Sequence, residues 1–439
     1  MKKYVALLLM VVMSFGLFAG CASQAPATEA PAAETEAPAA EVEETEEVVT
    51  IEYWQYFYET KVNLLDEVIA EFEAANPGIK VDHKHFPYDN YQQKLAASIA
   101  TGKGPNIINL YYGWVPKYVQ SGVLQELPAA LATEVDSEFA PMVSVNKIED
   151  KYYTIPIAVR TSALFYNLDI LEANGYTEAD VPQDLDTLVE MAEKMTIWDG
   201  DELIQEGMTW QPTGQYHSWL RPVLMTQFGG SPLSADKKTA QWNSPEGLEA
   251  FEFFMGLTQD KKIGVTDFYT DDVTAFMSGK AAFHIDGSYR LGTLRKKAED
   301  LNWGVAKLPA HNDIQTSFGS FWTNGITAQT TGKELEASEK FLAYLTSEDV
   351  MKRWTNEIGE IGARKSFTED EELLADAALR PFIEQLPTAI SYFYVDESAD
   401  RQALLDAIDQ VMLNGMDPKE ALDQANATVQ MMLDEYWAQ

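Results

Sequence analysis

The sequence predicts an α/β protein in which a parallel sheet is covered by helices. Three observations support this fold class. Apolar, strand-like runs alternate with amphipathic helical segments between residues 48 and 112, in the order strand, helix, strand, helix, strand. The chain has 439 residues, so that residues 51–439 are long enough for two lobes with separate cores. Cys21 is the single cysteine, so these cores must be held by packing and not by disulfides.

The elements are expected in a simple order. The sequence predicts strands at 48–54, 79–86 and 106–112, and helices at 62–75, 91–101 and 114–122. Ligands of such sheets bind beyond the carboxyl ends of the strands. Residues 54–59 (WQYFYE) and 111–114 (YYGW) are therefore expected at the mouth of a cleft.

The first 50 residues have a different composition. Two lysines and then an apolar run at 4–19 are typical of a signal peptide, because the run is too short for a membrane span of ~20 residues. Leu17-Phe18-Ala19-Gly20-Cys21 resembles the lipobox of bacterial lipoproteins, in which the cysteine is lipidated and becomes the mature N-terminus. Residues 22–50 carry eight Glu and no Lys or Arg, which predicts a disordered tether. Residues 1–20 are thus expected to be a lipoprotein signal peptide, and residues 21–50 a tether rich in Ala, Pro and Glu.

Charge and motifs exclude several functions. The formal net charge of −37 argues against nucleic acid as a partner, because phosphate backbones require clustered Lys and Arg. The sequence contains no G-x-S-x-G, Walker, G-x-G-x-x-G or H-E-x-x-H motif, and we expect no cofactor and no catalysis. His83 and His85 could ligate a metal, but no third ligand is evident, so no metal site is expected. Many acidic and aromatic residues would also suit a glycosidase, a geometry that the sequence leaves open.

Several segments resemble one family in order along the chain. The segments EFEAANPGIKVDHKHFPYDNYQQKLAASIATGKGPNI, YYTIPIAVRTSALFYNLDILEANGYTEADVPQDLDTLVEMAEKM, AFMSGKAAFHIDGSYRLG and EASEKFLAYLTSEDVMKRWTNEIGEIGARKSF are similar to the extracellular solute-binding proteins of family 1, which include maltose-binding protein. The chain has Tyr289 where the family's Gly-x-Trp motif has an aromatic residue. The resemblance covers nearly all of residues 51–439.

The resemblance implies a two-lobed periplasmic-binding-protein-like fold, with a hinge that the chain crosses three times and a ligand cleft between the lobes. The matched motifs place the crossings near Ala158, Gly319 and Phe367. Lobe 1 would comprise 51–158 and 320–367, and lobe 2 would comprise 159–319 and 368–439.

Candidate ligand contacts come from the carboxyl ends of the strands and from the family motifs. Aromatic faces would stack on a sugar ring, and polar side chains would bind its hydroxyls. Trp54 and Trp354 are expected in the core instead. The candidate contacts are Gln55, Tyr56, Tyr58, Tyr112, Trp114, Arg160, Asp286, Tyr289, Trp322 and Arg364.

The resemblance also implies the partners. The protein would capture a carbohydrate, an oligosaccharide by first choice, and deliver it to the permease subunits of an ABC importer. It would be a monomer held to the cell membrane only by its N-terminal lipid and facing the extracellular or periplasmic side. The alternatives are an anionic or phosphorylated small solute, for which Arg160, Arg290 and Arg364 are available, and a secreted glycoside hydrolase.

Overall fold

The computed structural model describes residues 48–438. The predicted signal peptide, the lipidation site Cys21 and nearly all of the predicted tether lie outside the described residues. The first strand begins at Val49, so the last two residues of the predicted tether belong to the fold.

The strands form a mixed sheet. Their bounds are β1 Val49–Tyr56, β2 Ile79–Phe86, β3 Ile107–Tyr111, β4 Thr154–Asn167, β5 Ile197–Asp199, β6 Glu202–Met208, β7 Ala281–Gly287, β8 Trp303–Ala306, β9 Gly319–Ile326 and β10 Ile361–Gly362. The strand order is β2-β1-β3-β9-β4-β7-β6-β5, and β8 and β10 pair with β4 beside this path.

The helices account for most of the remaining chain. The α-helices are α1 Glu59–Ala75, α2 Tyr88–Ala100, α3 Val115–Gln120, α4 Ala129–Glu138, α5 Leu168–Ala173, α6 Leu185–Met195, α7 Gln215–Gln227, α8 Pro245–Gln259, α9 Asp272–Met277, α10 Arg290–Lys297, α11 Gly332–Leu345, α12 Glu348–Ile358, α13 Glu371–Leu374, α14 Arg380–Glu384, α15 Glu397–Asn414 and α16 Pro418–Trp437. Short 3-10 turns are η1 Tyr112–Trp114, η2 Pro141–Asn146, η3 Glu178–Asp180, η4 Lys365–Glu369 and η5 Leu386–Thr388. None of the helices within residues 48–438 is both long and apolar enough to cross a membrane.

The predicted β-α-β-α-β run is confirmed. Strand β1 pairs in parallel with both β2 and β3, as expected for crossover connections through α1 and α2. Helix α1 forms because its apolar residues recur on one face, and Leu64, Val68 and Phe72 are buried there. Both helices begin three residues before their predicted starts, because charged and polar residues occupy the first turn.

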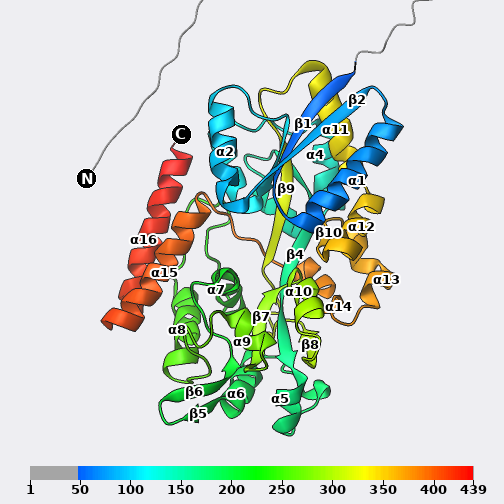
Figure 1. Ribbon diagram of the computed structural model, residues 1–439. Helices are drawn as coiled ribbons and strands as arrows, with labels where there is room; N and C mark the ends of the chain where they lie inside the picture. Colours follow the sequence, from blue (N-terminus) through cyan, green and yellow to red (C-terminus); the bar gives the residue numbers. More distant parts are fainter. Residues whose placement is uncertain (1–47, 439) are drawn as a thin grey trace, which may run out of the picture. The chain divides into compact units, whose positions relative to one another are not determined.

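The long strand β4 connects the two halves of the sheet. The first part of β4 pairs antiparallel with β9 over residues 154–161, and its second part pairs with β7 and β8. Strand β9 also pairs antiparallel with β3, so the sheet is mixed and not purely parallel. Figure 1 shows β4 and β9 running from the group that contains β1, β2 and α1 toward the group that contains β6, β7 and α6.

Candidate functional site

Five aromatic side chains meet where the strands β1, β2 and β3 end; we call them the aromatic cluster. Its members are Tyr56, Tyr88, Tyr111, Trp114 and Trp322. The ring centroids of Tyr56 and Trp322 are 4.1 Å apart, and those of Trp114 and Trp322 are 5.3 Å apart. Tyr111 lies 5.9 Å from Trp114, and Tyr88 lies 6.4 Å from Trp114.

The strand topology explains why these residues meet. Tyr56 and Tyr111 end β1 and β3, and Tyr88 follows the end of β2. These parallel strands end at the same edge of the sheet. Strand β9 brings Trp322 beside Tyr111 through the antiparallel ladder.

The aromatic cluster has a buried base and an open rim. Tyr56, Tyr111 and Trp322 are buried, Trp114 is half-buried, and Tyr88 is 52% exposed. Flat faces that remain accessible at such a rim can stack on the apolar face of a ring-shaped ligand.

Two cavities are relevant to the site. A cavity of about 380 Å³ lies beside the rim and is lined by Tyr88, Trp114 and Glu397 among others. Another cavity, of about 650 Å³, lies away from the aromatic cluster and is lined by residues such as Met142 and Phe393.

Three buried ionic side chains lie beneath the aromatic cluster; we call Lys61, Arg160 and Glu360 the ion cluster. One carboxylate oxygen of Glu360, Oε1, lies 2.8 Å from both Lys61 Nζ and Arg160 Nε. Trp354 Nε1 donates a hydrogen bond of 3.0 Å to the other oxygen, Oε2. Lys61 also donates to the hydroxyl of Tyr56 at 2.8 Å, which joins the ion cluster to the aromatic cluster.

Burial and charge act in opposite directions in the ion cluster. Burial lowers the pKa of the Lys61 ammonium to about 8, although the Glu360 charge opposes this shift. Burial would raise the pKa of Glu360, but the positive charges of Arg160 and Lys61 outweigh it and lower this pKa to about 2. Glu360 is therefore ionised at neutral pH.

Arg160 also faces an aromatic ring from the other half of the sheet. Its guanidinium carbon lies 5.4 Å from the ring centroid of Tyr289, a cation–π arrangement. Tyr289 precedes helix α10, and the neighbouring Arg290 donates through Nε to Asp286 at 2.6 Å. Arg160 thus contacts residues from both halves of the sheet.

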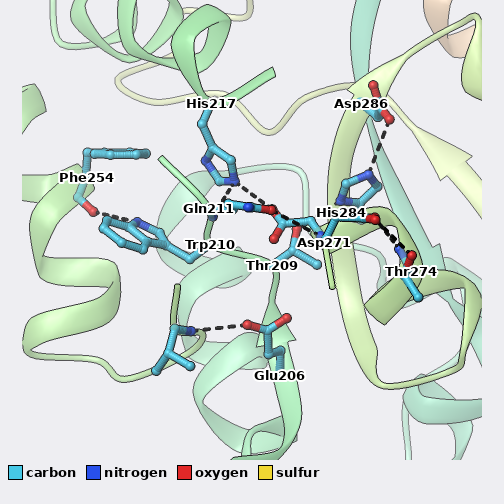
Figure 2. A network of polar contacts seen from close by, with 12 residues as sticks. Glu206, Thr209, Trp210, Gln211, His217, Phe254, Asp271, Thr274, His284 and Asp286 are labelled. Carbon is cyan, nitrogen blue, oxygen red and sulfur yellow. Dashed lines mark hydrogen bonds and ion pairs between the residues drawn. The ribbon is translucent and has the colours of Figure 1, made fainter. Parts of the chain in front are cut away.

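A buried polar network holds the strand that leads to Tyr289 (Figure 2). Within it, His284 contacts the hydroxyl of Thr209 through Nδ1 at 2.9 Å and the carboxylate of Asp286 through Nε2 at 3.4 Å. His217 Nε2 accepts a hydrogen bond from the backbone N–H of Gln211 at 2.9 Å. The side chains of Thr209, His217, His284 and Asp286 are all buried. The network therefore supports the position of Tyr289 and leaves no open face for a ligand.

The structure brings some predicted contacts together at the aromatic cluster. Tyr56, Trp114 and Trp322 belong to it, and Arg160 and Tyr289 lie beside it. Tyr58 is 50% exposed and its ring lies 5.8 Å from Lys61 Nζ.

Four predicted contacts lie outside the aromatic cluster and have partners within the protein. Tyr112 is fully buried and stacks on Phe321, whereas Tyr111 is the member of the pair that contacts Trp114 and Trp322. Gln55 is buried, where its amide contacts His83.

Asp286 and Arg364 also have charged partners within the protein. The carboxylate of Asp286 is inaccessible and accepts from Arg290 and the N–H of Gly287. Arg364 donates to the carbonyl of Thr346 and pairs with the carboxylate of Glu134, a residue of α4.

Sequence reasoning missed Tyr88, Lys61 and Glu360, and it chose Tyr112 as the contact from the expected cleft segment 111–114 in place of Tyr111. The carboxyl-end rule could have found Tyr88, because it follows β2 just as Tyr56 ends β1. No local signal points to the Lys61–Glu360 pair, whose members are 299 positions apart.

Within residues 48–438 no group of three or more His, Cys, Asp or Glu side chains is suited to hold a metal ion. His83, one of the two histidines considered as metal ligands, contacts Asp66.

The fold defines a class of protein: a two-lobed α/β protein of the periplasmic-binding type. The chain belongs to the bacterial extracellular solute-binding protein family, whose sequence model matches residues 67–381. This confirms the resemblance found in the sequence.

Individual relatives are distant in sequence. The chain is 24% identical over 386 residues to a maltotriose-binding protein of Pyrococcus abyssi, covering 84% of this chain and 78% of that protein. It is 24% identical over 385 residues to a galactooligosaccharide-binding protein of Bacillus subtilis, covering 84% of this chain and 86% of that protein. The crystal structure of a cyclic α-maltosyl-1,6-maltose binding protein from Arthrobacter globiformis has a TM-score of 0.77 at 20% identity, covering 88% of this chain and all of that chain. This last likeness establishes the fold.

Proposed function

We propose that this protein captures a carbohydrate, an oligosaccharide by first expectation, between two lobes and delivers it to an ABC importer. The observation that carries the proposal is the aromatic cluster at the carboxyl ends of β1, β2 and β3, with an open rim formed by Tyr88 and Trp114. A sugar ring has an apolar C–H face that stacks on such rings. The printed names of two relatives, which bind maltotriose and galactooligosaccharide, support the same class of ligand.

Closure of the two lobes would be a hinge motion. We place the three crossings near Ala158, Gly319 and Phe367. The first two are supported by the way β4 changes partners from β9 to β7 and β8 after residue 161. A ligand that contacts Trp114 on one side and Tyr289 on the other would favour the closed state, because it gains both contacts only there.

Titration calorimetry of the purified full-length chain against a panel of glycans tests the proposal. We expect saturable binding of at least one glycan, and chromatography after long incubation should recover that glycan intact, because the protein is proposed to bind without catalysis. New reducing ends that disappear on mutation of one carboxylate would place the protein among glycoside hydrolases instead. Absence of binding to every glycan would overturn the carbohydrate assignment.

We further propose that Cys21 anchors the protein to the outer face of the cell membrane as a monomer. The lipobox-like segment 17–21 is the observation that supports this anchor. A metabolic lipid label should tag the wild-type chain, and Cys21→Ser should remove the label and release the protein from the membrane fraction. If the serine variant keeps the label, Cys21 is not the lipidated residue.

A further inference from the structure

The ion cluster contains two cations and one carboxylate. Glu360 uses Oε1 for both Lys61 and Arg160, and Oε2 for the indole of Trp354. All three ionic side chains are at most 12% exposed. With the Lys61 ammonium protonated, the cluster holds one positive charge that no carboxylate within it compensates.

Unlike Arg160, other arginines near the strand ends each pair with a carboxylate that they do not share with a second lysine or arginine. Arg290 has its own carboxylate, Asp286, and Arg364 has Glu134 together with the carbonyl of Thr346. Glu397, beside the rim of the aromatic cluster, already faces Arg401 at 3.6 Å. Among the described residues, these carboxylates are therefore committed to other cations.

The guanidinium of Arg160 uses one of its three nitrogens for an ion pair. Within residues 48–438 this ion pair runs from Nε to Glu360, at 2.8 Å, and the guanidinium carbon lies 5.4 Å from the ring centroid of Tyr289. No hydrogen bond from its two terminal nitrogens occurs in the described part of the chain, and the side chain keeps 12% of its surface accessible. These nitrogens form the fork that binds a carboxylate through two parallel hydrogen bonds.

Lys61 and Arg160 are two cations, removed from most solvent, that share one carboxylate, so a ligand that supplies a second negative charge gains more from this site than a neutral one. A carboxylate carries one negative charge and matches the single uncompensated positive charge, whereas a phosphate carries about −1.5 to −2 and would exceed it. The nearby phenols of Tyr56, Tyr111 and Tyr289 are neutral, because burial raises the pKa of each.

We propose that the solute of this protein is an acidic sugar, whose ring stacks on the aromatic cluster and whose carboxylate binds the terminal nitrogens of Arg160. The proposal rests on the function proposed above and narrows its ligand to carbohydrates that contain a uronic or aldonic acid.

Calorimetry with matched sugars tests the proposal on the full-length chain. Each neutral disaccharide, such as galactobiose, is compared with its counterpart oxidised at C6, such as digalacturonic acid, and with a phosphorylated counterpart. We expect at least one acidic sugar to bind tenfold or more tightly than its neutral counterpart. Equal or weaker binding of every acid would overturn this inference and leave the proposed function intact, and preference for the phosphate would overturn the choice of a carboxylate. Absence of binding to all three kinds of sugar would overturn both proposals.

Two variants test whether Arg160 causes the preference for the acidic sugar. Arg160→Gln should abolish the preference for the acid, and it should keep or raise the melting temperature of the ligand-free protein, because Lys61 and Glu360 then form a balanced pair. Arg380→Gln, at an arginine whose side chain is 53% exposed, should leave the preference unchanged. If Arg160→Gln retains the full preference for the acid, the carboxylate is bound elsewhere.

Discussion

Glu360→Gln is expected to lower the free energy of unfolding by about 3–5 kcal/mol at pH 7. The substitution removes the one carboxylate that both Lys61 and Arg160 contact, and it leaves two cations buried together. Glutamine preserves the size of the side chain, so the loss of stability results from the missing charge and not from a cavity. Urea unfolding of the wild type and of Glu360→Gln measures the difference in the free energy of unfolding.

Glu384→Gln is the matched control. Glu384 is 44% exposed and lies 3.8 Å from Lys307, so its removal should change the free energy of unfolding by at most about 1 kcal/mol. If Glu360→Gln is as mild as this control, the ion cluster does not hold the charges assigned to it.

The cost of Glu360→Gln should depend on pH. The pKa of Glu360 is about 2 in the folded protein and 4.5 in its unperturbed form. A depressed carboxylate pKa adds stability that is complete above pH 4.5 and is lost as the pH falls toward 2, about 3 kcal/mol for this shift. The wild type should therefore lose this part of its stability between pH 5 and 2, and the difference from the variant should narrow there.

Trp114→Ala is expected to weaken glycan binding tenfold to a thousandfold, about 1–4 kcal/mol. The side chain forms the rim of the aromatic cluster and is only half-buried, so the melting temperature of the ligand-free protein should change little. Calorimetry and thermal unfolding of the same preparations separate the two effects.

Trp198→Ala provides the comparison, because Trp198 is 38% exposed on β5, a strand at the far end of the sheet order. It should retain full affinity. Normal binding together with early melting in Trp114→Ala would place Trp114 in the core and the ligand elsewhere.

Local patterns predicted the first half of the sheet well. The periodicity of apolar residues located β1 to β3 and the helices between them, because one-sided burial imposes a period on the sequence. It could not predict that β9 enters the sheet between β3 and β4, because that pairing joins residues such as Asn109 and Asn324, 215 positions apart.

The sequence predicted some of the residues of the candidate site that lie at the carboxyl ends of strands. The carboxyl-end rule found Tyr56 and Trp114, but alternation along β3 could not decide which of Tyr111 and Tyr112 belongs to the aromatic cluster. Glu360 gave no signal, because an acidic residue becomes distinctive only when distant cations are packed around it.

The position of β9 has a consequence for biosynthesis. Strand β3 remains an edge until residues 319–326 are made, and β4 lacks β10 until residue 362 is made. Contacts between such distant residues form slowly, because the long intervening loop must close first. During synthesis the growing chain therefore stays without a finished sheet until more than three quarters of it has been translated, and β3 and β4 wait longest for their final neighbours.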